Sequence, residues 1–264
     1  MKQEKMKQEK MKTRHQSMGG SREERQALDQ LENLRQELID KCGYLNEKNW
    51  VASVACMNRI SLSKLLFYSE IVKQIIDVPG VILELGVQWG ATTNLLYNLT
   101  SIVDPFNFRR RVIGFDTFEG FPAGSISETE RAHGWRKNDL VAAVNAKEIA
   151  EQCLSAHQAF SALNHMRRHE FVKGDVVQTV PAWLAENEHE TIALCIFDLD
   201  LGIPTREALN HILPRCQKGS ILVFDEYSHP KFREEGVAAR ELIDTMNIRP
   251  IKSPLLPYTS YFVL

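Results

Sequence analysis

The chain has 264 residues, of which 44% are hydrophobic and 25% charged, and its formal net charge is -2. These values are ordinary for a globular protein with one large α/β domain or two small ones. They give no electrostatic case for a nucleic acid or an anionic membrane as a partner, and no apolar run approaches the ~18 residues of a membrane span. The one dense basic cluster, Arg109 to Arg111, is typical of a solvated loop before a strand.

The five cysteines are widely spaced, and none of them forms a CxxC pair. A disulfide framework or a thiolate metal site is therefore not expected, and a reducing cytoplasm suits this pattern. We expect a cytoplasmic protein whose partner is a small molecule rather than a nucleic acid or a membrane.

The first 78 residues divide into a polar tail and a helical region. Residues 1–20 repeat the pentapeptide MKQEK and offer no apolar face, which predicts a disordered tail. Leucines at three- and four-residue spacing predict a helix from residue 21 onward, and a second helix is predicted at 61–76. Pro79 and Gly80 end this region, whose helices could pair two protomers, so we expect a homo-oligomer.

Short apolar segments and helical segments alternate through the rest of the chain, residues 79–264. Five strands are predicted at 81–85, 111–115, 171–173, 192–197 and 220–224. Helices are predicted to begin at 92 and to span 180–186, 206–213 and 236–246, and 257–264 suits a terminal edge strand. This alternation predicts a parallel sheet covered by helices on both faces.

A long segment at about 120–170 interrupts this alternation. It contains a predicted helix near 147–168. Long insertions of this kind are often lids over ligand sites, so we expect this segment to be a lid.

The segment Glu84-Leu-Gly86-Val-Gln88-Trp-Gly90-Ala-Thr92 predicts a ligand-binding turn between a strand and a helix. Its glycines permit a tight turn and close approach of a ligand to the backbone. Glu84 replaces the first glycine of the dinucleotide fingerprint GxGxxG and would repel a pyrophosphate. A carboxylate there suits a cationic ligand such as S-adenosylmethionine, although a purely structural turn is also compatible with this pattern.

Asp116 ends the second predicted strand, one helix after Glu84. An acid at the tip of the neighbouring strand can accept hydrogen bonds from both ribose hydroxyls of a nucleoside. The alternative interpretation is a helix-capping aspartate.

Two later strands also end in acids, at Asp198-Leu-Asp200 and at Asp225-Glu226. One helix separates them, so both strand tips should emerge at the same edge of a parallel sheet. Carboxylates that converge there would repel one another unless a cation lay between them, and oxygen ligands favour Mg²⁺ or a similar ion. Separate helix caps or solvated acids are the alternative.

Taken together, these motifs resemble those of the macrocin O-methyltransferase (TylF/MycF) family of class I S-adenosylmethionine-dependent methyltransferases. The resemblance is carried by PGVILELGVQWG from Pro79, GFDTFEGFP from Gly114, VKGD ending at Asp175, DLD from Asp198 and KGSILVFDEY from Lys218. It implies a doubly wound, mostly parallel seven-stranded Rossmann-like sheet with an antiparallel C-terminal edge strand. It also implies metal-dependent O-methylation, often of sugar hydroxyls in natural product biosynthesis.

The resemblance further implies which residues form the site. The cofactor would be surrounded by Glu84, Gly86, Gln88, Thr92, Asp116 and Asp175, with Asp175 near the adenine. We also expect Gly90, Thr117 and Asp198 to bind the cofactor. The metal ligands would be Asp198, Asp225 and Glu226. The chain departs from the family at Glu226, where an aspartate is usual, and at Gly202, where a tyrosine is usual.

Methyl transfer requires a base that removes the proton of the acceptor hydroxyl. Asp198 is the first candidate, and His229 and His133 are alternatives, although each histidine could equally be a surface or hydrogen-bonded residue. Trp135 and Tyr227 could line the acceptor pocket.

Three other functions are compatible with parts of the pattern. A catechol-like phenol or another small polar molecule could be the acceptor for the same cofactor and metal. A nucleotide-binding oxidoreductase is disfavoured by Glu84 and by the missing GxGxxG. A scaffold without activity is disfavoured by the acids at all four strand tips.

Overall fold

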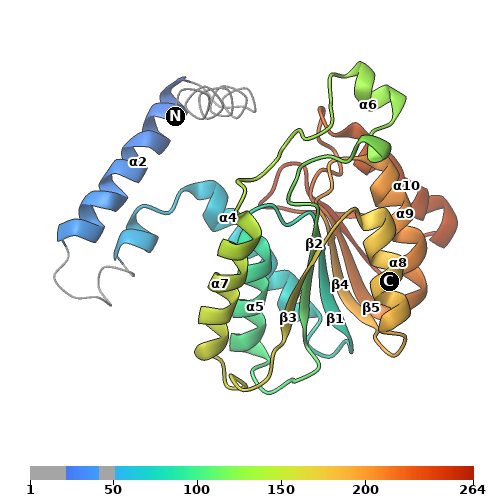
Figure 1. Cartoon of the computed structure of the whole chain (residues 1–264), viewed down its shortest axis with the longest axis horizontal. Coiled ribbons are helices and arrows are strands. Elements are labelled where there is room, and N and C mark those ends of the chain that lie inside the picture. The colour runs from blue at the N-terminus through green and yellow to red at the C-terminus, as the bar shows by residue number, and fades with distance from the viewer. Residues whose placement is uncertain (1–21, 42–50) are drawn as a thin grey trace. The chain divides into compact units, whose positions relative to one another are not determined.

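The computed structural model describes residues 22–41 and 51–264 (Figure 1). The tail predicted at residues 1–20 lies outside this part of the chain. The chain divides into two compact units, Met1–Ser63 and Lys64–Leu264. In the first unit, helix α2 spans Arg22–Lys41, where the leucine spacing predicts a helix.

The second unit is built on a seven-stranded sheet with the order β3-β2-β1-β4-β5-β7-β6. The strands from β3 to β5 are parallel to one another, and β7 runs antiparallel to both β5 and β6. Their bounds are Val81–Leu85 for β1, Val112–Asp116 for β2, His169–Lys173 for β3, Ile192–Phe197 for β4, Cys216–Phe224 for β5, Ile251–Lys252 for β6 and Ser260–Val263 for β7. The predicted doubly wound, mostly parallel sheet is confirmed.

Helices cover both faces of this sheet (Figure 1). One face packs against α4 (Arg59–Gln74), α5 (Ala91–Val103) and α7 (Ala146–Ala159) in a single hydrophobic cluster. The other face packs against α8 (Val176–Glu186), α9 (Gly202–Ile212) and α10 (Arg233–Met246) in a second cluster. Strands β1 and β4 are buried along their whole length because they lie between these two layers.

The strand register brings the acids of the sequence motifs to one edge of the sheet. Leu85 of β1 pairs with Phe115 of β2 and with Phe197 of β4, which in turn pairs with Phe224 of β5. The acids that end or follow these strands therefore emerge together at the carboxyl edge, where open α/β sheets bind ligands.

Several predicted elements differ in detail, three of them as follows. The terminal strand β7 lies between β5 and β6, so the two-residue strand β6 forms the edge. Strand β5 begins at Cys216 rather than at residue 220, because a register shift near Gly219, whose φ is 89°, interrupts the apolar pattern. The helix predicted at 147–168 ends at Ala159, and a turn then leads into β3.

The basic cluster before β2 is not a solvated loop, because Arg110 is 2% exposed. Its guanidinium donates hydrogen bonds to the carbonyls of Gly80, Ile75 and Val78 at 2.7–2.8 Å. The side chain thus closes the turn between α4 and β1, where the helix leaves carbonyl groups without partners inside the helix.

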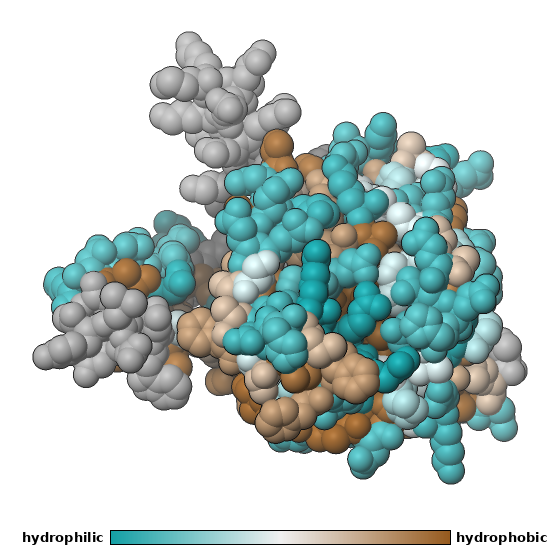
Figure 2. Space-filling view, turned by 60° about the horizontal axis from the view of Figure 1, so that its bottom comes forward, coloured by the Kyte–Doolittle hydropathy of each residue, from teal (hydrophilic) through white to brown (hydrophobic). Residues whose placement is uncertain are grey.

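The surface is mostly hydrophilic on the face shown in Figure 2, with hydrophobic side chains gathered in one part of it. Within residues 22–41 and 51–264, no helix combines the length and the apolar character that crossing a membrane would require.

Candidate active site

The turn after β1 passes directly against the tip of β4. Gly86 has a φ of 93°, and a Cβ at this position would lie 1.8 Å from the backbone oxygen of Asp198. Gly90, with a φ of 75°, precedes α5, and a Cβ there would lie 2.6 Å from the Cβ of Ala150. Both glycines are therefore required by close packing as well as by their backbone conformation.

Asp116 holds this turn in place from the end of β2. Its Oδ2 accepts hydrogen bonds from the backbone N–H groups of Val87 and Gln88, each at 2.7 Å. Its Oδ1 accepts from the N–H of Phe118 at 2.6 Å. A carboxylate oxygen can accept about two hydrogen bonds, so Oδ1 has room for one further donor such as a ribose hydroxyl.

Glu84 lies beneath the turn rather than at its surface, and it is 2% exposed. Its carboxylate accepts a hydrogen bond from the hydroxyl of Thr93 on α5. Burial raises the pKa of Glu84 to about 8, which outweighs the lowering effect of the Thr93 hydrogen bond. The side chain is well placed to fix the start of α5 against β1, while its role toward a cofactor stays a prediction.

Asp198 and Asp225 follow β4 and β5 and lie close enough to influence each other. Burial, and secondly the charge of Asp225, raise the pKa of Asp198 to about 7. Asp225 is 8% exposed, and both of its carboxylate oxygens have partners. Its Oδ1 accepts from the hydroxyl of Thr259 at 2.9 Å, and its Oδ2 lies 3.2 Å from Nζ of Lys64.

Lys64 is a site residue that the sequence pattern does not predict. It lies on α4 and extends to the carboxyl edge of the sheet, where the charges of Asp225, Asp198 and Glu84 act on its ammonium. Although burial lowers the pKa of Lys64, the three carboxylates together raise it above its ordinary value. The pattern could not reveal this role, since a lysine on an amphipathic helix usually marks the solvated face.

Glu235 at the start of α10 is a second residue that the sequence does not point out. It is fully buried, and its Oε2 accepts hydrogen bonds from the N–H groups of Leu199 and Asp200 at 3.1 and 2.9 Å. Its Oε1 accepts from the N–H of Glu226 at 3.0 Å. One side chain thus aligns the two acidic turns that follow β4 and β5.

Glu226 and His229 lie together beyond β5. Burial, and secondly the charge of Asp225, raise the pKa of Glu226 to about 8. Nδ1 of His229 lies 3.6 Å from Oε2 of Glu226 and accepts a hydrogen bond from the N–H of Lys231 at 3.2 Å. The imidazole packs edge-on against Tyr258, 4.4 Å between ring centroids, and burial lowers its pKa.

Three hydrogen bonds join the segment between β2 and α7 to residues near the carboxyl edge of the sheet. The hydroxyl of Ser125 donates to Oδ2 of Asp175 at 2.9 Å, and Asp175 also caps α8. Gln88 of the β1 turn donates to the carbonyl of Leu140 at 3.4 Å. The indole N–H of Trp135 donates to the carbonyl of Lys231 at 3.3 Å, with the ring stacked on Phe232.

Glu130 fastens the short helix α6 (Glu128–Ala132) to the start of α9. Its Oε1 accepts from the N–H of Gly202 at 2.8 Å, and its Oε2 accepts from the N–H of Ser127 at 2.7 Å. Gly202, where the resemblance led us to expect a tyrosine, has no space for a side chain, because a Cβ there would lie 2.7 Å from the Cβ of Glu234.

Most of the predicted site residues lie at or next to the carboxyl edge of the sheet. Glu84, Asp116, Asp198 and Asp225 meet at the carboxyl edge, and Gln88 and Gly90 lie in the adjoining turn. Thr92 lies half-buried in the first turn of α5, and the hydroxyl of Thr117 is directed to the carbonyl of Gly120 at 2.7 Å. His133 is exposed at the end of α6, and no contact with the acids is recorded for it in the described residues.

The donor chemistry of Asp198, Asp225 and Glu226 fits a hard divalent cation, which prefers carboxylate oxygens. Their arrangement does not yet form a metal site: the described ranges contain no group of three or more His, Cys, Asp and Glu side chains placed to hold a metal ion. The cation recorded beside Asp225 is the ammonium of Lys64. Mg²⁺ binding stays a prediction.

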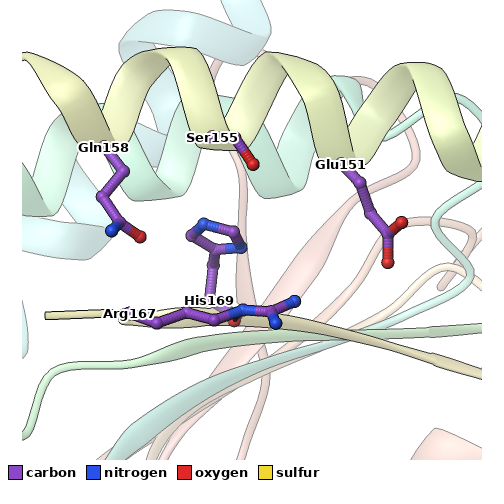
Figure 3. A pocket seen from close by; sticks show the side chains of 5 residues that line it. All are labelled: Glu151, Ser155, Gln158, Arg167 and His169. Atoms are coloured by element: carbon purple, nitrogen blue, oxygen red, sulfur yellow. Dashed lines mark hydrogen bonds between the residues drawn. The ribbon is translucent and has the colours of Figure 1, made fainter.

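A separate cavity of about 270 Å³ lies between α7 and the start of β3 (Figure 3). It is lined by Glu151, Ser155, Gln158, Arg167 and His169. His169 pairs with Val112 at the beginning of β2, so this cavity lies at the amino edge of the parallel strands. It is therefore not part of the group of acids at the carboxyl edge.

Comparison with known families and structures assigns the fold and chemistry. The profile of the macrocin O-methyltransferase (TylF) family matches residues 4–252. The crystal structure of the calicheamicin methyltransferase CalS11 is similar, with 31% identity, a TM-score of 0.83, and coverage of 93% of this chain and 94% of that one. No curated protein sequence matches the chain.

Two further structures agree with this assignment. The apo structure of CalS11, described as a TDP-rhamnose 3'-O-methyltransferase of calicheamicin biosynthesis, is 30% identical, with a TM-score of 0.76 and coverage of 93% and 96%. The O-methyltransferase NovP shares the fold at 21% identity, with a TM-score of 0.58 and coverage of 76% and 79%. This chain belongs to the macrocin O-methyltransferase family of S-adenosylmethionine-dependent O-methyltransferases.

Proposed function

We propose that this enzyme methylates a hydroxyl group of a sugar, either on a nucleotide-activated sugar or on a sugar-bearing natural product. The observation that carries the proposal is the likeness to CalS11 over 93% of the chain, because CalS11 is described as acting on TDP-rhamnose. The acids at the carboxyl edge support it, since their oxygens can accept hydrogen bonds from a polyhydroxylated acceptor.

In the proposed reaction, an oxygen of the acceptor attacks the methyl carbon of S-adenosylmethionine in line with the breaking carbon–sulfur bond. The products are the methyl ether and S-adenosylhomocysteine, and the proton of the hydroxyl passes to a base. Asp198 is the proposed base, because it follows β4 at the carboxyl edge of the sheet, where open α/β sheets bind ligands, and its carboxylate can accept the hydroxyl proton. Holding both reactants in this geometry provides much of the rate enhancement.

We also propose that Mg²⁺ or a similar ion binds at Asp198, Asp225 and Glu226. The support is chemical: the three carboxyls lie in a poorly solvated place, and each of Asp198 and Glu226 has a raised pKa to which Asp225 contributes. When bound, such an ion would lower the pKa of an acceptor hydroxyl and orient it. Loss of turnover with a chelator, restored by added Mg²⁺, is the expected result.

The acceptor is tested by incubating the purified protein and S-adenosylmethionine with TDP-rhamnose, other nucleotide sugars, free polyols and a catechol. Mass spectrometry should detect addition of one methyl group to a sugar. Methylation of the catechol with no methylated sugar would instead support the phenol alternative. Calorimetric titration with S-adenosylhomocysteine serves as the control that the cofactor site is intact.

A further inference from the structure

The ammonium of Lys64 pairs with Asp225, one of the proposed metal ligands. Its Nζ lies 3.2 Å from Oδ2 of Asp225, and the side chain of Asp225 is only 10% exposed. The carboxylates of Asp198 and Glu84 also act on this ammonium. The ammonium thus pairs with Asp225 after β5 and lies near the acids at the tips of β1 and β4.

The surroundings of Lys64 favour this placement. The following residues of α4, Phe67, Tyr68 and Ile71, are at most 3% exposed and anchor the helix in the core. The aliphatic part of a lysine can cover apolar surface while its ammonium reaches a polar group. The base of the side chain is therefore fixed, and its flexible end is able to move away from Asp225.

Asp225 has limited capacity for a second cation. Thr259 donates to its Oδ1 at 2.9 Å, which holds the carboxylate with Oδ2 toward Lys64. A divalent ion that used Oδ2 would lie close to the ammonium, and two positive charges at such a distance repel each other. The ammonium and the ion should therefore exclude each other from Asp225.

We propose that Lys64 is a positioning residue that binds Asp225 in competition with a divalent cation, so that the acidic edge is charge-balanced before the ion arrives. This inference rests on the metal-binding part of the proposed function. The ion gains access when the ammonium withdraws from Oδ2. Lys64 thereby sets the affinity for the ion without being one of its ligands.

The test is binding of Mn²⁺ alone to the full chain saturated with S-adenosylhomocysteine, followed by the electron paramagnetic resonance signal of free Mn²⁺. Lys64→Met, which keeps the aliphatic length and removes the charge, should bind Mn²⁺ about tenfold more tightly than the wild type. Lys64→Arg should bind no more tightly than the wild type, because it keeps a cation. Lys64→Gln provides a second neutral variant should the methionine variant fail to fold.

Lys73→Met is the matched control, because Lys73 is on the same helix but exposed, and it pairs with Glu70 at 2.7 Å. It should leave Mn²⁺ binding unchanged. Equal affinities in the wild type and in a folded neutral Lys64 variant, or no Mn²⁺ binding by any of them, would overturn the inference. S-adenosylhomocysteine binding distinguishes failure of this inference from failure of the proposed function. If the wild type bound no S-adenosylhomocysteine, the proposed methyltransferase site itself would be contradicted.

Discussion

The hydroxyl of Thr259 donates a hydrogen bond to Oδ1 of Asp225, so a residue just before the last strand orients an acid that follows β5. The same hydroxyl also approaches the backbone carbonyl of Asp225 at 3.2 Å. The antiparallel pairing of β7 with β5 brings the two residues together. The C-terminal strand therefore contributes to the site as well as to the sheet.

Replacing Thr259 with valine should lower turnover about tenfold or more, because small misplacements of a reacting group are costly. The lost hydrogen bond should also reduce the free energy of unfolding by about 0.5–1.5 kcal/mol. Turnover and chemical denaturation measure the two effects. Thr191→Val is the matched control. The hydroxyl of Thr191, just before β4, donates a hydrogen bond to the carbonyl of Pro79, and the turnover of this variant should match that of the wild type. Equal losses in both variants would argue against a specific role for Thr259.

Glu235→Gln should destabilise the protein by about 1–3 kcal/mol, because an amide has one acceptor oxygen where the carboxyl serves three backbone N–H groups. Thermal unfolding measures the change. The comparison is Glu241→Gln on the same helix, which removes an exposed ion pair with Arg206 and should cost less than about 1 kcal/mol. Similar melting temperatures for the two variants would count against the bridging role of Glu235.

The buried Glu84 should make the stability of the ligand-free protein depend on pH. Its pKa of about 8 in the folded chain exceeds the ordinary value of 4.5, so the protonated form stabilises the fold. That contribution is complete below the ordinary pKa and disappears as pH rises through about 8. Melting temperature should therefore fall between about pH 4.5 and about pH 8.

Glu84→Gln should flatten this fall by several degrees, at about 2–4 °C per kcal/mol for a protein of this size. The amide oxygen of the new side chain can still accept the Thr93 hydrogen bond. The control, Glu70→Gln, changes an exposed acid on α4 and should keep the wild-type slope. A Glu84→Gln variant that retains the full slope would show that other groups cause it.

Asp198→Asn should reduce turnover by about 10²–10⁴, the usual contribution of a positioned base. Calorimetric titration with S-adenosylhomocysteine then separates loss of the base from loss of a cofactor contact, since Asp198 is also a predicted cofactor residue. His133→Ala and His229→Ala are the comparison variants, because both histidines are alternative bases. A larger loss in either histidine variant than in Asp198→Asn would move the base to that residue.

Gly202→Ala should lower stability by about 1–3 kcal/mol through overpacking, because its Cβ would meet Glu234 at 2.7 Å. Gly124→Ala is the matched control, since no atom lies within 4 Å of a Cβ at that position. Melting temperatures of the two variants test the contrast. Equal melting temperatures for the two alanine variants would contradict the prediction, because they would mean that α9 and α10 move apart at little cost to admit the Cβ.

The parallel sheet could be predicted from the sequence because β1 and β4 are continuous apolar runs between two helical layers. The convergence of Asp198 and Asp225 follows from the same topology, since parallel strands joined by one helix end at one edge. These inferences need only the order of elements and the residues at their ends.

Residues that act across elements could not be predicted in this way. Lys64 and Glu235 each lie on an amphipathic helix, where a charged residue ordinarily faces solvent. The prediction of a solvated loop at Arg110 is wrong for a similar reason. The partners of these side chains belong to distant parts of the chain, and a single sequence contains no signal that pairs them.

The segment between β2 and β3 has two parts: the stretch before α7, which has many exposed residues, and α7 itself, which packs into the core. Amino-acid changes should be tolerated more readily in the first part than in the second. Ala146, Ala150 and Leu154 of α7 are fully buried in the main core, whereas His133 and Lys137 on the preceding stretch are exposed. Substitutions at the exposed positions of this stretch can therefore accumulate without disturbing the sheet, whereas its buried residues, among them Glu130 and Ala142, are less free to change. A chimaera that exchanges acceptor preference between related enzymes should accordingly place its second junction just before Ala146, leaving α7 with its native core.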